Sequence, residues 1–143
     1  MASDNPTDVT REAAASTAAA PVKPTIYVCT TCKRVGESDV EPRPGALLAA
    51  ATEQAATGTE VTVRRLRCLA NCIRGPSVAM RCNGSWTYVF GGLDPDCADA
   101  LIEGVRLLAG ADDGILPWRG RPEILKRGLI ARVPPIGFQG MDE

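Results

Sequence analysis

The chain has 143 residues and a formal net charge of −1, with six cysteines and no histidine. A net charge this close to zero gives no overall attraction to nucleic acid or to an anionic membrane surface, so we expect neither as a partner. The lack of histidine excludes catalysis by a histidine base, mixed Cys/His zinc sites and clusters that need two histidine ligands. A transition metal bound here would be held mainly by thiolates.

The first 24 residues indicate a tail rather than a folded element. They start with acidic and polar residues, and their alanine-rich part is interrupted by Ser16 and Thr17. A signal peptide would need a basic start and a continuous apolar stretch of about 7–15 residues. We therefore expect a disordered N-terminal tail over 1–24 and a cytoplasmic protein. In that compartment, spaced cysteines favour metal or redox chemistry over structural disulfides.

The rest of the chain predicts short strands and two longer helices. Runs of β-branched and aromatic residues predict the strands, and Asn83-Gly84 is a strong hairpin signal. Pro44 suits the first turn of one helix, and Asp94-Pro95 indicates the start of the other. In chain order, the predicted elements are a strand at 25–28, a helix at 44–56, strands at 60–66, 77–82 and 85–90, and a helix at 95–109.

This order predicts an α/β (α+β) fold. The first strand–helix–strand unit should be a right-handed parallel crossover, and the next two strands form a hairpin. The result is a thioredoxin-like β-α-β-β-β-α arrangement, with a four-stranded mixed sheet and flanking helices. We expect this domain at 25–110, followed by a C-terminal extension at 111–143. Within the extension, the predicted element is a short helix at 121–127.

Four cysteines follow the two strands of the predicted parallel unit. Cys29 ends the first strand and Cys68 the second, and each is followed by another cysteine, Cys32 at C-x2-C and Cys72 at C-x3-C. The carboxyl ends of neighbouring parallel strands lie roughly 5 Å apart, so the two loops would present four thiols to one point. Four thiolates suit zinc, a 2Fe–2S cluster or a 4Fe–4S cluster. The sequence therefore predicts these four cysteines as metal ligands.

Two other functions of the same cysteines stay open. The four thiols could hold zinc in an interaction module. Alternatively, Cys29 and Cys32 could form a redox-active dithiol that acts on partner disulfides, although no predicted helix begins just after them to activate a thiol. Of the other two cysteines, Cys97 lies on the apolar stripe of the last helix and is expected in the core. Cys82, at the hairpin, is expected to be structural rather than a ligand, and it is the best substitute ligand if Cys32 is not bound.

Basic residues accompany both cysteine pairs. They are Lys33, Arg34, Arg64, Arg65, Arg67 and Arg74, and neither 29–34 nor 64–74 contains an acidic residue. A 2Fe–2S core on four thiolates carries a formal charge of about −2 when oxidised and about −3 when reduced, so basic neighbours would raise its potential. They would also steer an acidic redox partner protein toward this edge. The competing interpretation is that they are solvated residues at strand edges.

The segment Cys68-Leu69-Ala70-Asn71-Cys72-Ile73-Arg74-Gly75-Pro76, with the hairpin and aromatic strand after it, resembles thioredoxin-like 2Fe–2S ferredoxins. It also resembles the related peripheral iron–sulfur subunit of respiratory complex I. The resemblance implies that Cys68 and Cys72 are the second ligand pair and Cys29 the first ligand. Cys32 departs from the ferredoxin pattern, whose first two cysteines are usually more widely spaced. Pro76 takes the place where such folds carry a cis-proline.

The span from 26 to about 135 is similar to a predicted metal-binding family of unknown function. Its landmarks here include the C-x2-C at 29–32, Arg43-Pro44-Gly45 and the Val133-Pro134-Pro135 ending. Members are often encoded near cobalamin-biosynthesis genes and cobalt-handling GTPases, so the resemblance implies a link to cobalt metabolism. We expect a 2Fe–2S protein that serves one-electron transfer or redox sensing rather than an enzyme. A homodimer is the assembly left open.

Overall fold

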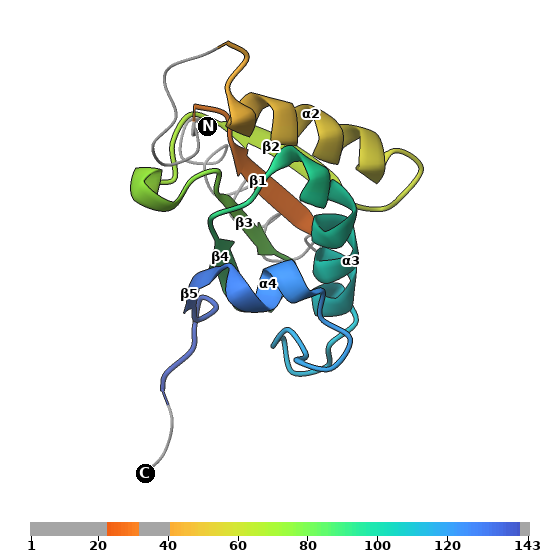
Figure 1. The fold of residues 1–143 in the computed structure, drawn as a ribbon. Coiled ribbons are helices and arrows are strands. Elements are labelled where there is room, and N and C mark those ends of the chain that lie inside the picture. The colour runs from red at the N-terminus through yellow and green to blue at the C-terminus, as the bar shows by residue number, and fades with distance from the viewer. Residues whose placement is uncertain (1–22, 32–40, 141–143) are drawn as a thin grey trace, which may run out of the picture.

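The computed structural model describes residues 23–31 and 41–140, and Figure 1 shows its fold. The elements in chain order are β1 (Thr25–Cys29), α2 (Pro44–Ala56), β2 (Thr62–Leu66), the 3-10 helix η1 (Cys72–Arg74), β3 (Val78–Arg81), β4 (Thr87–Phe90), the 3-10 helix η2 (Pro95–Cys97), α3 (Ala98–Ala109), α4 (Glu123–Arg127) and β5 (Leu129–Val133). Most of the predicted tail over 1–24 lies outside the described residues. None of the described helices has the length and apolar character needed to span a bilayer.

The strands form one five-stranded sheet in the order β2-β1-β3-β4-β5. β1 and β2 are parallel, and every other neighbouring pair is antiparallel. The predicted α/β (α+β) class and the thioredoxin-like order β-α-β-β-β-α are thereby confirmed. The predicted parallel crossover consists of β1, α2 and β2, and it places the carboxyl ends of β1 and β2 at one edge of the sheet.

The sheet has one strand more than the four predicted. β5 pairs antiparallel with β4, from Thr87 opposite Val133 to Phe90 opposite Leu129, with an irregularity next to Phe90. The side chains of β5 are exposed or half-buried, so its sequence carries no strong alternation. The strand forms because the outer edge of β4 offers backbone groups that need partners, which a reading of local sequence does not register.

The two long helices begin and end where the sequence indicates. Pro44 occupies the first turn of α2, and Gly58, with φ of +81°, follows its end in the left-handed region that favours glycine. Before α3, the carboxylate of Asp94 accepts a hydrogen bond from the backbone N–H of Asp96 at 2.9 Å. This cap begins the short 3-10 turn η2, which continues into α3.

The core lies between one face of the sheet and the helices α2 and α3, as Figure 1 shows. Alternate residues of β1, β3 and β4 point into it, and they meet apolar residues from both helices. The main contributors are Ile26, Val28, Val78, Met80, Tyr88 and Phe90 from the strands, with Leu48, Ala49, Leu101, Val105 and Leu108 from the helices. This layer fixes β1 and β3, and with them the ends of the strands that carry cysteines.

Residues beyond α3 pack on the same core. The backbone N–H of Leu116 donates to the Tyr88 hydroxyl at 2.9 Å, and Leu125 of α4 is fully buried. Arg121 is only 9% exposed, and its guanidinium donates to the carbonyls of Leu116 at 2.7 Å and Pro117 at 3.1 Å. Burial lowers the pKa of this guanidinium from its usual value. The helix α4 falls inside the segment 121–127 for which the sequence predicts a helix.

Candidate metal centre

The buried end of β1 and the chain leaving β2 are in direct contact. Cys29 lies opposite Leu66 in the parallel register, and the N–H of Thr30 donates to the Leu66 carbonyl at 2.8 Å. Cys29 is only 1% exposed, and its Sγ donates to the carbonyl of Arg67 at 3.4 Å. The hydroxyl of Thr31 donates to the same carbonyl. The two chains that carry the predicted ligands therefore leave the sheet side by side.

Cys68 and Cys72 lie in the loop that follows β2, and both are exposed. The Sγ of Cys68 accepts a hydrogen bond from the N–H of Ala70 at 3.1 Å. Ala70 has φ of +60°, a left-handed conformation that costs an L-residue about 1–2 kcal/mol. Hydrogen bonds from backbone N–H groups to the sulfurs are one of the factors that set cluster potentials. The loop thus presents an exposed sulfur that already accepts a backbone hydrogen bond.

The same loop is tied down at its far end. The N–H of Arg74 donates to the Asn71 carbonyl at 3.0 Å and closes the single turn of η1. The Asn71 amide donates to the hydroxyl of the buried Ser77 at 2.9 Å. The Gly75–Pro76 peptide bond is cis, which agrees with what the ferredoxin resemblance implies for Pro76.

The four predicted ligands do not form a finished centre in the part of the chain that is described. Cys32 lies outside the described residues. Within the described residues, no group of three or more His, Cys, Asp or Glu side chains is arranged to hold a metal ion. Cys29, Cys68 and Cys72 lie on adjoining segments at one edge of the sheet, with the first thiol buried and the other two exposed.

The structure separates Cys82 from this edge. The backbone N–H of Cys29 donates to the carbonyl of Ser77, which directly precedes β3. Cys82 follows the other end of β3, where Arg81 lies opposite Thr25. Five residues of extended chain span roughly 16 Å, which is too far for one cluster to bridge. The register therefore opposes Cys82 as the substitute ligand. The hairpin signal at Asn83-Gly84 does not by itself indicate that β3 runs antiparallel to β1, which is what places Cys82 at the other end.

The thiols of Cys82 and Cys97 are half-buried against the core. Burial raises the pKa of both thiols, and the hydrogen bond with Ser85 partly offsets the effect on Cys82. Cys97 donates through Sγ to the carbonyl of Asp94 at 3.0 Å. A protonated, partly buried thiol is a poor metal ligand, so both positions fit a structural role better than a metal site.

The predicted basic residues have different surroundings. Arg65 forms a two-point ion pair with Glu53 of α2, with N–O distances of 2.7 and 2.8 Å. This hydrogen bond lowers the pKa of the Glu53 carboxyl. Arg64, Arg67 and Arg74 are exposed, and no ion pair joins them to another described residue. Lys33 and Arg34 lie outside the described residues.

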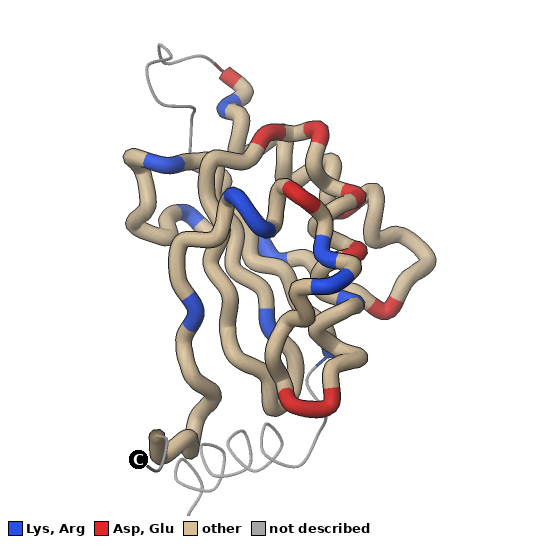
Figure 2. Tube along the Cα trace, turned by 60° about the horizontal axis from the view of Figure 1, so that its bottom comes forward, with Lys and Arg blue, Asp and Glu red and all other residues tan. Residues whose placement is uncertain are grey.

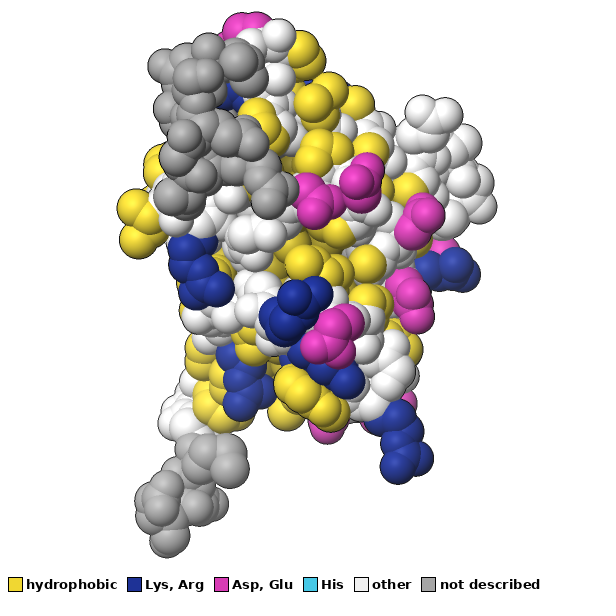
Figure 3. All heavy atoms as spheres, in the orientation of Figure 1, with side chains coloured by type: hydrophobic (Ala, Val, Ile, Leu, Met, Phe, Trp, Pro, Cys, Tyr) yellow, Lys and Arg dark blue, Asp and Glu magenta, His cyan; other side chains and the backbone are white. Residues whose placement is uncertain are grey.

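The described charges divide between the layers of the fold. No described strand carries an acidic residue, whereas arginines occur in β2, β3 and β5, as the tube in Figure 2 shows. On the face shown in Figure 3, acidic side chains are interspersed with those of Lys and Arg. The exposed acidic residues of α2, η2 and α3 are Glu53, Asp96, Asp99 and Glu103. The charged residues of the described strands, including the one that leads to Cys68, are therefore basic only, and the described acidic residues lie in helices and loops.

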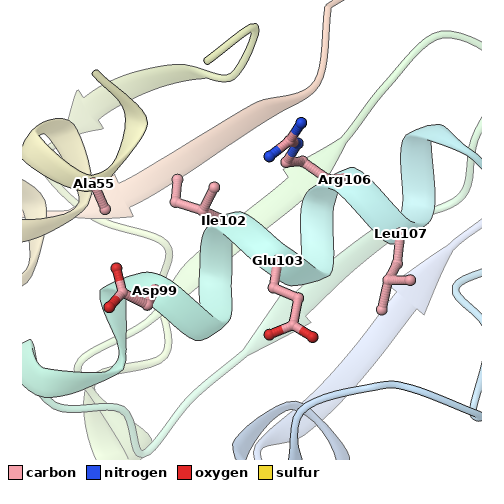
Figure 4. Close-up of a pocket in the computed structure, with 6 residues that line it drawn as sticks. All are labelled: Ala55, Asp99, Ile102, Glu103, Arg106 and Leu107. Carbon is pink, nitrogen blue, oxygen red and sulfur yellow. The ribbon is translucent and has the colours of Figure 1, made fainter. Parts of the chain in front are cut away.

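An open hollow of about 390 Å³ lies between α2 and α3, and none of the candidate ligand cysteines in the described part of the chain lines it. It is lined by Ala55, Asp99, Ile102, Glu103, Arg106 and Leu107, which Figure 4 shows as sticks. Ala55 and Ile102 approach one another from the two helices, while Arg106 is paired with Glu60 at 3.2 Å. Its lining combines apolar groups with carboxylates and offers no thiol, so it does not belong to the candidate metal centre.

Residues that shape the cysteine loop without being ligands were not foreseen from the sequence. Ala70, Asn71 and Ser77 carry no signal on their own, because a positive φ on alanine and a side-chain bond over six residues are properties of the folded loop. The pair Gly91-Gly92 does carry a signal in the sequence, although only the fold shows which segment it meets. A pair of glycines directly after a strand is a known sign of close backbone approach, and Gly91 does lie against this loop.

Comparisons with known proteins agree with this fold. Residues 26–135 match the model of a family described as a protein of unknown function, DUF1636. A search of curated proteins finds no match. A solved structure of a thioredoxin-like [2Fe-2S] ferredoxin from Aquifex aeolicus aligns with a TM-score of 0.53 at 18% identity, covering 82% of this chain and 99% of that chain. A crystal structure of the wild-type thioredoxin-like [2Fe-2S] ferredoxin from Aquifex aeolicus gives 0.51 at 14% identity, covering 77% and 98%. At these identities the likeness establishes the fold alone.

Proposed function

Because this chain belongs to the DUF1636 family of proteins of unknown function, we propose its role from its site: a 2Fe–2S protein that carries single electrons or senses redox state. The observation that carries the proposal is a thiol-only donor set at the edge of a thioredoxin-like sheet where β1 and β2 end together. The fold likeness adds support, since both solved structures are of thioredoxin-like [2Fe-2S] ferredoxins.

The donor set fits such a cluster chemically. Cys29, Cys68 and Cys72 would be three ligands, with Cys32 as the fourth, and the chain has no histidine to compete with them. The exposed thiols of Cys68 and Cys72 are accessible to incoming iron. The N–H of Ala70 donates to the Cys68 sulfur, as N–H groups near clusters do when they tune the potential. When bound, the cluster would supply a one-electron redox centre, without substrate chemistry or an enzyme active site.

The surroundings of this edge favour an acidic redox partner protein. Arg64, Arg67 and Arg74 are exposed and unpaired among the described residues, so their charge is available to a partner. Ile73, between Cys72 and Arg74, is 81% exposed and adds an apolar contact next to a ligand. Arg65 has no part in this surface because Glu53 already neutralises it.

Two alternatives use the same cysteines. A zinc ion on four thiolates would make the protein an interaction module, and metal analysis separates this case from a cluster. A dithiol of Cys29 and Cys32 is less favoured, since the Cys29 thiol is buried and a nucleophilic thiol must reach a partner disulfide. An insulin-reduction assay tests it. A link to cobalamin and a homodimer are predictions that neither the fold nor the site bears on.

The test is anaerobic purification followed by metal and sulfide analysis, absorption and EPR spectroscopy. We expect brown protein with about two irons per chain, bleached by dithionite, with an EPR signal in the reduced state. Cys68→Ser and Cys72→Ser should abolish assembly, while Cys97→Ser should leave the spectrum unchanged. Colourless protein with stoichiometric zinc after anaerobic reconstitution with iron and sulfide would overturn the proposal.

A further inference from the structure

One buried serine connects the two cysteine-bearing segments. Asn71 lies between Cys68 and Cys72, and its Nδ2 donates to the Ser77 hydroxyl at 2.9 Å. The carbonyl of Ser77 accepts the backbone N–H of Cys29 at 3.1 Å. Ser77 is 0% exposed, so both bonds are shielded from competing water. Its side chain holds the loop of one cysteine pair, and its backbone holds the strand end of the other.

Gly91, directly after β4, is a second support of the loop. A Cβ placed on Gly91 would lie 2.6 Å from the carbonyl oxygen of Arg74 and 2.6 Å from Nδ2 of Asn71. Both distances are below any normal contact for a side-chain carbon, so the loop rests on the backbone itself. The N–H of Gly92 donates to the same Arg74 carbonyl and fastens this contact.

The C-terminal elements back this support. The N–H of Gly91 donates to the carbonyl of Gly128 at 2.8 Å. A Cβ on Gly128 would lie 2.8 Å from the Gly91 oxygen, so here too two backbones meet directly. Gly128 joins α4 to β5. The connection between these elements is therefore in contact with the end of β4, against which the cysteine loop packs.

We infer that Asn71, Ser77 and Gly91 are positioning residues, which hold the Cys68–Cys72 loop at a fixed place relative to Cys29, with the turn at Gly128 behind them. The inference rests on the proposed function only for the identity of the group that the loop would bind. The positioning itself involves no metal, because every contact named above joins two groups of the protein. It can therefore be measured separately in metal-free and loaded protein.

The test compares two variants at the loop with two matched controls. Ser77→Ala removes the acceptor of Asn71, and Gly91→Ala pushes against the loop. Ser85→Ala is the control for the first, since Ser85 is also buried and hydrogen-bonded but lies at the other end of β3. Gly110→Ala is the control for the second, because a Cβ there meets nothing closer than 3.6 Å.

In metal-free, reduced protein the readout is trypsin cleavage after Arg67 and Arg74, which flank the loop. Loss of one buried hydrogen bond should raise this cleavage rate about fivefold in Ser77→Ala, with a similar or larger rise in Gly91→Ala. Neither control should change it. Equal cleavage in all four variants overturns the inference, and Ser77→Ala alone decides the matter if Gly91→Ala does not fold.

In loaded protein the readouts are the rate of iron loss to a chelator and the midpoint potential. The loop variants should lose iron faster and shift the potential, and the controls should match the parent protein. A loss of stability alone would affect Ser85→Ala as much as Ser77→Ala, which would count against positioning. If no cluster assembles in the parent protein, the proposed function fails, while the cleavage experiment still decides the positioning.

Discussion

The thiol of Cys29 donates to the carbonyl of Arg67 at 3.4 Å, across the parallel edge of the sheet. This contact makes Cys29 both a packed residue and a predicted ligand, and two substitutions separate these roles. Cys29→Ser keeps a donor for the Arg67 carbonyl, whereas Cys29→Ala leaves that carbonyl with the Thr31 hydroxyl but without a donor at position 29. In urea unfolding of metal-free protein, we expect the alanine variant to be less stable than the serine variant by about 1 kcal/mol.

Both Cys29 variants should lose the parent visible spectrum after reconstitution, because neither supplies a thiolate. Cys97→Ser is the matched control, since Cys97 is also partly buried but is not one of the candidate ligands. A Cys29→Ala protein with an unchanged spectrum would remove Cys29 from the ligand set.

The thiols should differ in alkylation by iodoacetamide in folded, metal-free protein. Burial raises the pKa of Cys82 and Cys97 above the usual 9.0, so less of each is thiolate near neutral pH. Cys68 and Cys72 are exposed and should react first, as peptide mass spectrometry would show. Because the folded state keeps these two thiols protonated more readily than the unfolded state does, they stabilise the fold below pH 9.0. This stabilisation is lost as the pH rises through their raised pKa values. Early labelling of Cys97 would contradict its placement against the core.

The unpaired arginines should control electron exchange with an anionic reagent. Oxidation of the reduced protein by ferricyanide, which takes one electron, should slow roughly threefold in Arg67→Gln and Arg74→Gln at low ionic strength. The effect should vanish at about 0.5 M salt, where the field is screened within a few ångströms. Stopped-flow absorption measures both rates.

Arg65→Gln is the control for that experiment, because Glu53 already pairs with Arg65 at 2.7 Å. Arg65→Gln removes one positive charge, as the other two variants do, but it removes that charge from an ion pair and leaves Glu53 unpaired. If the position of a charge relative to the cysteines determines the rate, Arg65→Gln should slow the reaction with ferricyanide less than Arg67→Gln or Arg74→Gln. An equal effect for all three arginines would mean that net charge alone matters.

Ala70 offers a test of the loop conformation. Ala70→Gly keeps the N–H that donates to Cys68 and relieves the left-handed φ of +60°, whereas Ala70→Val makes that φ worse. We expect the glycine variant to assemble its cluster normally and the valine variant to lose iron faster, reflecting added strain of about 1 kcal/mol or more. Chelator kinetics measure the difference, and indistinguishable rates would argue against this loop geometry in the loaded protein.

Elements with local signals were predictable from the sequence. The proline at the start of α2, the Asp94 cap before α3 and the Asn83-Gly84 turn each act within a few residues, so they indicate the same structure in isolation and in the fold. The parallel pairing of β1 and β2 also follows from chain order, because the crossover leaves few alternatives. This was enough to bring Cys29 and Cys68 to one edge.

What could not be predicted depends on partners far away in the chain. β5 forms because β4 has an open edge with unpaired backbone groups. The charge of Arg65 is neutralised because the fold brings it into contact with Glu53 of α2. Cys82 looked available until the direction of β3 placed it at the other end of the sheet. The contact of Gly91 with Asn71 is a meeting of two loops, and no periodicity in either one announces it.

The arginines on the outer strands have a further consequence. β2 and β5 end the sheet, and a free strand edge is a template on which another chain can add and aggregate. At the β2 edge, the charges of Arg64 and Arg65 oppose pairing with another chain. At the β5 edge, the same role falls to Arg132, which lies 4.3 Å from the centre of the Trp86 ring, and to the prolines after Val133. Variants that remove these charges to weaken partner binding would also leave a strand edge that can pair with another chain. Their solubility should therefore be checked before their affinity is compared.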